Sequence, residues 1–164
     1  MDTKELNKIQ KDREEKLKKL RDQGFNFPND FDKTHNLGEI AEKFSDSSKL
    51  DLEKNSNRVQ SAGRIVLKRV MGKVSFMTLE DTSGRLQAYF SLNNLGDSLE
   101  EIKDWDLGDI VGIKGNLFRT KTDELTVEVE EALLLTKSLN PMPEKHKGIS
   151  NIETIYRQRY IDLM

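Results

Sequence analysis

The sequence contains no cysteine and only three prolines among its 164 residues. Without cysteine the chain forms neither disulfides nor thiolate zinc sites, and its composition fits a reducing compartment, which we expect to be the cytoplasm. There is no apolar run of the roughly 18 residues that a membrane-spanning helix needs. The chain is charged from its second residue, so we predict no secretory signal and no membrane anchor.

The length of the chain predicts one domain, or one domain with appendages. Hydrophobic residues make up 35% of the sequence and charged residues 34%, a balance that indicates a small core inside a large polar surface. The two histidines, His35 and His146, lie far apart in loop-like sequence. We therefore predict no metal site.

Acidic residues are missing from one long sector, although the chain as a whole carries a net charge of −2. Between residues 54 and 79 there is no aspartate or glutamate, and the basic residues are Lys54, Arg58, Arg64, Lys68, Arg69 and Lys73. A mildly acidic protein with one basic sector can bind a polyanion locally.

Residues 74–90 alternate between apolar and polar side chains, which predicts two antiparallel strands joined by a tight turn. The turn is Asp81-Thr82-Ser83-Gly84, a run of turn-forming residues. The predicted pairs are Glu80 with Arg85, Thr78 with Gln87 and Phe76 with Tyr89 on one face, and Leu79 with Leu86 and Met77 with Ala88 on the other. The second face is expected to line the core.

The first face has an unusual composition, because two aromatic rings, Phe76 and Tyr89, stand beside the Gln87 amide. Aromatic side chains stack on nucleic-acid bases with about 1–3 kcal/mol per base. A glutamine amide offers a donor and an acceptor side by side to a base edge. We interpret this face as a base-binding surface, and a second core face covered by another element stays open as the alternative.

The order of the predicted elements is that of an OB-fold. Strands are expected at 59–67, 74–80 and 85–90, a short helix at 95–102, and strands at 110–118 and 125–135. We predict an all-β core of five strands closed into an OB-fold barrel, with appended helices. Gly63 is expected at a bulge or bend, and Gly112 and Gly115 should let the fourth strand curve. The predicted divisions are a helical extension (1–57), the barrel (58–137) and an exit segment (138–164).

The N-terminal extension is predicted to begin with a helix over residues 2–23, with Asp2 and Glu5 at capping-box spacing. A second, short helix capped by Thr34 should cover residues 37–44, and residues 45–57 read as a polar linker. The first helix is rich in lysine. Whether it also touches nucleic acid stays open.

In an OB-fold, oligonucleotides bind to the exposed face of strands 2 and 3 and to the loops that join strands 1–2 and 4–5. The candidate nucleic-acid-binding residues are Arg64, Lys68, Arg69, Lys73, Phe76, Gln87, Tyr89, Lys121 and Glu124. Of these, Arg69 and Lys73 are expected in one rim loop, and Lys121 and Glu124 in the other. An acid at a phosphate-binding rim is explained if Glu124 accepts a hydrogen bond from a base. No catalytic, cofactor-binding or metal-binding residue is predicted.

The exit segment contains Leu139-Asn140-Pro141-Met142-Pro143, which predicts a rigid connection. Ser150 and Glu153 have capping-box spacing ahead of an amphipathic helix. The sequence stops at Met164 within that helix, as expected of a truncated chain.

Three blocks of the sequence carry a family resemblance: KRVMGKVSFMTLEDTSGRLQ, KDWDLGDIVGIKGNLFRTKTDELTV, and LLTKSLNPMPEKHKGI followed by YRQRYIDLM. They resemble the class II lysyl-tRNA synthetases, specifically the bacterial-type N-terminal anticodon-binding domain, over essentially the whole chain. The first block is shared in style with the aspartyl and asparaginyl enzymes, and the other two are similar to the lysine enzyme. The family's catalytic domain begins near RQRYIDLM.

The resemblance implies roles for four residues. In this family a Phe on strand 2 stacks on an anticodon base, a Gln on strand 3 reads the central U, and a Glu in the strand 4–5 loop contacts a neighbouring base. These positions match Phe76, Gln87 and Glu124, and Arg69 best matches a basic residue of the strand 1–2 loop. The family usually has Gly before that Glu. Here it is Asp123, which tolerates the left-handed conformation, so we expect the turn to persist.

The resemblance further implies a tRNA partner with a U-rich, lysine-type (UUU) anticodon. The full enzyme would be a homodimer that attaches lysine to tRNA with ATP and Mg²⁺, whereas this fragment alone is expected to be inactive in that reaction and to hold no cofactor. Two alternatives stay open. One is a free-standing OB-fold binder of single-stranded nucleic acid, and the other is the equivalent domain of an aspartyl- or asparaginyl-tRNA synthetase.

Overall fold

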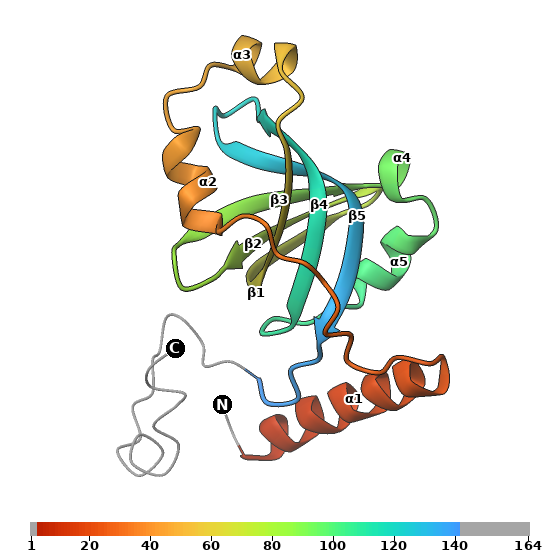
Figure 1. The fold of residues 1–164 in the computed structure, drawn as a ribbon. Coiled ribbons are helices and arrows are strands. Elements are labelled where there is room, and N and C mark those ends of the chain that lie inside the picture. Colours follow the sequence, from red (N-terminus) through yellow and green to blue (C-terminus); the bar gives the residue numbers. More distant parts are fainter. Residues whose placement is uncertain (1–2, 142–164) are drawn as a thin grey trace.

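The computed structural model describes residues 3–141, which form a closed barrel of five strands with five helices around it (Figure 1). The strands are β1 (Arg58–Met71), β2 (Val74–Glu80), β3 (Arg85–Ser91), β4 (Ile110–Arg119) and β5 (Leu125–Thr136). Their order is β1-β2-β3-β5-β4, and β4 pairs with β1 to close the barrel. Among the neighbouring pairs of these five strands, only β3 and β5 run parallel, and the other pairs are antiparallel. The predicted five-stranded OB-fold barrel is confirmed.

The β2–β3 hairpin has the register that the alternation predicts. All five predicted pairs occur, from Glu80 with Arg85 to Phe76 with Tyr89. A slip of one residue would move Met77 and Leu79 from the core to the solvent face. Because these side chains are only 1% and 0% exposed, burial fixes the register. The turn closes where the Asp81 amide donates to the Gly84 carbonyl.

Strand β1 is longer than predicted, and its irregularity lies elsewhere. The segment 68–71, predicted as a loop, continues the ladder with β2 as far as the pair Met71–Val74. The bulge expected at Gly63 lies at Val66, where the β1–β2 register shifts. Gly63 instead allows close packing, because a Cβ there would lie 2.7 Å from the Leu37 side chain.

The helices are α1 (Thr3–Asp22), α2 (Leu37–Lys43), α3 (Lys49–Lys54), α4 (Leu92–Leu95) and α5 (Ser98–Lys103). The single helix predicted at 95–102 is confirmed only over part of its length, as α5. The chain forms α4 and α5 instead, separated at Gly96, whose φ of +55° ends the first. The N-cap of α2 is Asn36 rather than Thr34. Within the described residues no helix has both the length and the apolar character needed to span a membrane.

The polar segment 45–57, predicted as a linker, contains helix α3. Its N-cap is Ser48, whose hydroxyl accepts from the Asp51 amide while the Asp51 carboxylate accepts from the Ser48 amide. This reciprocal capping box and the burial of Leu52 stabilise the short helix. The same Ser-x-x-Asp spacing was visible in the sequence.

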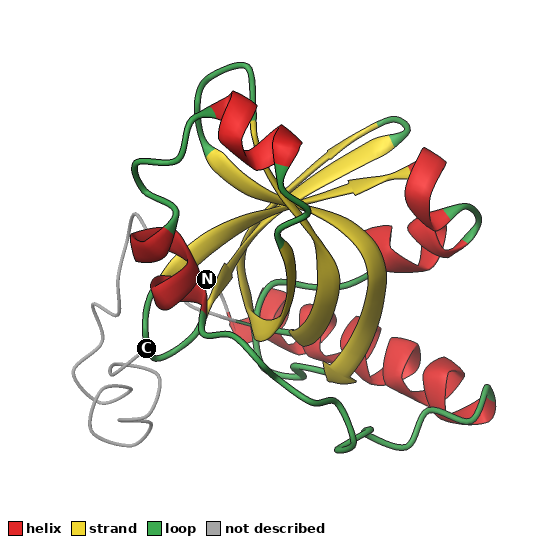
Figure 2. Cartoon of the chain, turned by 45° about the horizontal axis from the view of Figure 1, so that its top comes forward, coloured by secondary structure: helices red, strands yellow, loops and turns green. Residues whose placement is uncertain are grey.

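Helix α1 lies across one end of the barrel, and the β4–β5 loop lies at the other end, near α3 (Figures 1 and 2). A buried charge cluster holds α1 in place. Lys137 Nζ lies 2.8 Å from the Asp109 carboxylate and also pairs with Asp106, which in turn accepts from Lys16 of α1. The predicted capping by Asp2 and the predicted C-terminal helix lie outside the described residues.

Candidate nucleic-acid interface

One row of side chains crosses three strands on the outer face of the barrel. Arg69 of β1 lies opposite Phe76 of β2, and Phe76 lies opposite Tyr89 of β3. The ring centroids of Phe76 and Tyr89 are 5.0 Å apart at 47°. Phe118 of β4 adds a third ring, edge-on to Tyr89 at 5.8 Å. The β-ladder thus aligns a cation with a short aromatic platform.

The next row carries the glutamine. Gln87 lies opposite Thr78 of β2 and opposite Thr126 of the parallel strand β5. Its side chain is 7% exposed and both ends of its amide have partners. Nε2 donates to the Glu124 carboxylate at 2.7 Å, and Oε1 accepts from the Thr126 hydroxyl at 3.1 Å.

The β4–β5 loop brings Glu124 to this amide through a left-handed turn. Asp123 has a φ of +65°, so the predicted left-handed conformation persists at this position. Its carbonyl accepts from the Arg119 guanidinium at 2.7 Å. The Glu124 amide donates to the Thr120 hydroxyl, and the Thr120 amide donates to the Glu124 carbonyl. These hydrogen bonds hold the loop in this turn.

The rings, the amide and the loop enclose one hollow of about 480 Å³. Its lining includes six of the nine predicted residues, namely Arg69, Phe76, Gln87, Tyr89, Lys121 and Glu124, together with Met71, Phe118, Thr120 and Thr122. The structure therefore brings most of the predicted site together. Arg69 reaches it from the end of β1 and not from a loop, because the strand continues to Met71.

The other three predicted residues do not line the hollow, and two of them bind backbone carbonyls elsewhere. Lys68 Nζ donates to the carbonyls of Lys103 and Trp105, both at 2.5 Å, and burial lowers the pKa of this amine. Arg64 donates to the Gly108 carbonyl at 3.3 Å. Both cations thus hold the segment between α5 and β4. Lys73 is exposed in the β1–β2 turn and does not line the hollow.

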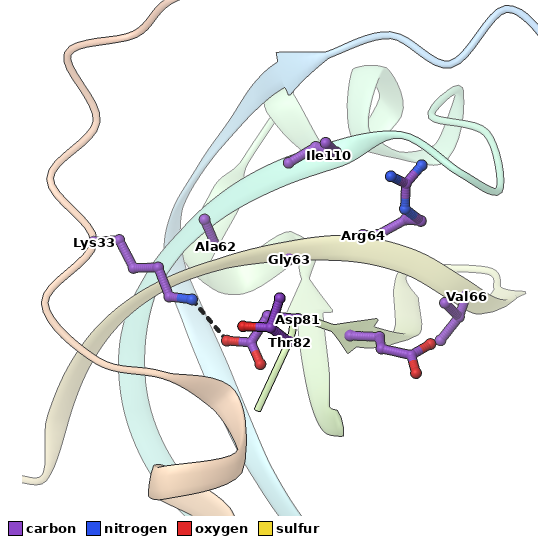
Figure 3. Close-up of a pocket in the computed structure, with 9 residues that line it drawn as sticks. Lys33, Ala62, Gly63, Arg64, Val66, Asp81, Thr82 and Ile110 are labelled. Atoms are coloured by element: carbon purple, nitrogen blue, oxygen red, sulfur yellow. Dashed lines mark hydrogen bonds and ion pairs between the residues drawn. The ribbon is translucent and has the colours of Figure 1, made fainter. Parts of the chain in front are cut away.

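Arg64 also lines a separate pocket of about 420 Å³, between β1, the β2–β3 turn and the segment before α2 (Figure 3). The Lys33 amine reaches into this pocket and lies 2.7 Å from the Asp81 carboxylate. Partial burial opposes ionisation of Asp81, but hydrogen bonds from the Leu37 amide, Lys33 and Ser83 outweigh it and hold the pKa of Asp81 below its ordinary value. The ion pair ties the segment before α2 to the hairpin.

Five residues of the site were missed from the sequence: Met71, Thr120 and Thr122 line the hollow, and Phe118 and Thr126 contact Tyr89 and Gln87. Phe118 lies on a strand that the sequence predicts, but the sequence does not show which face of the barrel it occupies. Closure of the barrel brings its ring beside Tyr89. Thr126 is fully buried and touches Gln87 only because β5 runs parallel to β3. The parallel pairing of β3 and β5 brings Gln87 and Thr126 together, although they are 39 residues apart in the sequence. Within residues 3–141 no group of three or more acidic or histidine side chains could hold a metal ion.

Comparison with known proteins agrees with the barrel fold. Residues 59–135 match the family model of the OB-fold nucleic acid binding domain. The chain is 49% identical over 152 residues to a lysine–tRNA ligase of Legionella pneumophila (strain Lens), covering 93% of this chain and 31% of that protein. It is 48% identical over 163 residues to the lysine–tRNA ligase of Burkholderia cenocepacia (strain HI2424), covering 99% and 32%.

The chain thus spans about a third of the length of these relatives. Its similarity extends beyond the barrel to the helical extension, since 93% or more of the chain is aligned. The chain belongs to the lysyl-tRNA synthetase family, in which it corresponds to the N-terminal OB-fold anticodon-binding domain of the bacterial enzymes.

Proposed function

We propose that this domain binds the anticodon loop of a lysine tRNA with a UUU-type anticodon, and that the hollow beside Gln87 receives the middle base. The observation that carries the proposal is the convergence of an aromatic pair, a buried amide and two exposed cations in one hollow. A base stacked on Phe76 would present its edge to Gln87, while Arg69 and Lys121 would face the phosphates.

The chemistry of the amide supports uracil. Uracil offers an N3–H donor between two carbonyl acceptors. The Gln87 amide has one N–H and one oxygen lone pair left after its bonds to Glu124 and Thr126. A mismatched base leaves buried polar groups unpaired, which costs about 1–3 kcal/mol per base.

We propose further that the whole protein is a lysine–tRNA ligase. On this proposal the full enzyme works as a cytoplasmic homodimer that uses ATP and Mg²⁺ to attach lysine to tRNA, and the present chain alone does not catalyse that reaction. The domain's share of the work is recognition, because it selects the tRNA that the rest of the enzyme would charge.

Fluorescence anisotropy with short RNA stem-loops tests this function. We expect a UUU loop to bind about tenfold or more tighter than GUC or GUU loops. The first alternative, a general single-strand binder, predicts equal affinities that all fall together as salt is raised. The second, a domain of the aspartyl or asparaginyl type, predicts the reverse order, with GUC or GUU preferred.

A further inference from the structure

The Gln87 amide is held in one of its two orientations by partners of different chemistry. A glutamine amide can turn by 180° about its last bond at little intrinsic cost, because its two ends have nearly the same size. In the structure Nε2 lies 2.7 Å from Glu124 Oε2, and Oε1 lies 3.1 Å from the Thr126 hydroxyl. Turning the amide would exchange these contacts.

The two orientations correspond to two different pyrimidines. For a base stacked in one pose, uracil presents an N3–H donor beside the O4 acceptor, and cytosine presents the N3 acceptor beside an amino donor. The same edge is thus matched by the amide in one orientation for uracil and by the turned amide for cytosine. An amide that turned freely would accept both bases.

Of the two partners, only Glu124 discriminates between the two orientations of the Gln87 amide. The Thr126 hydroxyl can donate to Oε1 or accept from Nε2, because a hydroxyl does both. It also has the Glu124 carbonyl as a second acceptor, at 3.1 Å. The ionised Glu124 carboxylate is an acceptor only. A turned amide would place Oε1 against this carboxylate, two acceptors facing each other.

We propose that Glu124 is a positioning residue that fixes the orientation of the Gln87 amide and thereby makes the site select uracil over cytosine at the base that Gln87 reads. This inference rests on the proposed function, because it concerns the same base. It assigns to the β4–β5 loop a role in specificity at the middle position that does not require Glu124 to touch that base.

Glu124→Gln isolates the directional effect. The variant keeps the length and hydrogen-bonding capacity of the side chain, but its amide can accept or donate and so permits either orientation of Gln87. We expect the preference for a UUU over a UCU stem-loop to fall from about tenfold to about threefold or less, through tighter binding of UCU. Loss of the negative charge strengthens binding of both loops equally and therefore cancels in the ratio.

Thr126→Val is the matched control, because it removes the other hydrogen bond to the same amide and leaves the carboxylate in place. Its affinity for both loops can fall, but its preference for UUU should stay within about twofold of the unchanged chain. Glu124→Met, which can neither donate nor accept strongly, repeats the test should Glu124→Gln fold poorly. Thermal unfolding of each variant shows that the barrel is intact.

The outcomes separate this inference from the proposed function. If the unchanged chain binds UUU and UCU equally, the proposed function fails. If the unchanged chain prefers UUU and Glu124→Gln keeps that preference, the proposed function stands and the positioning role of Glu124 is refuted. If Glu124→Gln loses the preference only by binding UUU more weakly, Glu124 is a direct contact to the base, and the positioning role is again refuted.

Discussion

Phe76 is the single residue on which affinity should depend most. It lies between Arg69 and Tyr89 in the row across the sheet, with its ring half-buried against Tyr89 at 5.0 Å between centroids. Stacking is tolerant of sequence because every base has a π-face. Phe76 is therefore expected to contribute to affinity for any loop and little to the choice among loops.

Phe76→Leu should weaken binding of the UUU stem-loop by about 1–3 kcal/mol, the usual value of one stacked base, and should weaken binding of UCU by the same factor. The matched control is Phe27→Leu, at a residue that is 38% exposed but lies outside the hollow. Anisotropy titrations measure both. A loss of affinity confined to UUU would contradict the assignment of Phe76 as a stacking platform.

Asp123 shows how backbone conformation limits a single position. Its φ of +65° is accessible to glycine without cost and to aspartate at a small one, but a β-branched residue is strained there. Asp123→Gly should therefore keep RNA affinity within about twofold, whereas Asp123→Val should destabilise the loop by about 1–2 kcal/mol and weaken UUU binding. Equal affinities of the two variants would show that loop conformation does not matter for binding.

At the scale of elements, the β2–β3 turn and α2 depend on each other through Asp81. One carboxylate oxygen accepts from the Ser83 amide and hydroxyl, and the other accepts from Lys33 and from the Leu37 amide at the start of α2. The same groups hold the pKa of Asp81 below its ordinary value of 3.8. Because the pKa of Asp81 is lower in the folded chain than in the unfolded chain, its ionised carboxylate stabilises the fold at pH values above the unfolded-state pKa. This stabilisation is lost as the pH falls through the folded-state pKa.

Asp81→Asn should lower the free energy of unfolding by about 1–3 kcal/mol at neutral pH, because in either orientation the amide nitrogen would face a backbone N–H of Ser83 or Leu37, which only donates. The deficit should shrink as pH falls below about 4, because Asp81 of the unfolded chain takes up a proton there and the stabilisation by the ionised carboxylate declines. Urea unfolding at several pH values measures it, with the exposed Asp30→Asn as control. A deficit that is constant with pH would contradict the role of the ionised carboxylate.

The sequence predicted the elements that short-range patterns define and missed those that depend on distant partners. The β2–β3 register followed from alternation and from four turn residues. The extension of β1 was missed because Lys68 and Arg69 look like loop residues. In the fold, β2 supplies their backbone partners, and carbonyls 35 and 37 residues away accept from the Lys68 amine. The site was predicted on the hairpin and at Arg69, Lys121 and Glu124. Phe118 and Thr126 were missed, because their positions depend on barrel closure and on the pairing of β3 with β5.

At the scale of the whole molecule, the buried charges beside α1 join the extension to the barrel. Asp109 is fully buried and accepts from both Lys137 and the Ser138 amide. Breaking a buried pair from one side leaves an uncompensated charge, at a cost of about 3–5 kcal/mol. Lys137→Met should therefore destabilise the chain by that amount in urea unfolding.

The double variant Asp109→Asn with Lys137→Met should lose less stability than the two single variants added together, because it leaves no buried charge unpaired in this contact. RNA affinity of any folded fraction should be unchanged, since Asp109 precedes β4 and Lys137 follows β5, at the ends of these strands away from the β4–β5 loop. Full additivity would show that the two side chains do not interact.

The positions of the exposed cations predict which of them make RNA affinity depend on salt concentration. Arg69 and Lys121 line the hollow, whereas α1 lies across the other end of the barrel. Arg69→Gln and Lys121→Gln should each reduce the slope of log affinity against log salt by about 0.7, the value for one phosphate contact to a single strand. Lys8→Gln and Lys11→Gln on α1 should leave the slope unchanged. A comparable change on α1 would extend the RNA-binding surface to the helical extension.

The most direct measurement is a cycle that combines Gln87→Ala with replacement of the middle U by C in the stem-loop. In the unchanged chain we expect the replacement to weaken binding by about 1–3 kcal/mol. With Gln87→Ala, the two loops should bind equally. The coupling between the Gln87 side chain and the middle base would then account for nearly all of the difference in binding free energy between the two loops. If the unchanged chain binds both loops equally, or if Gln87→Ala still prefers U, the anticodon is not read at this position of the barrel.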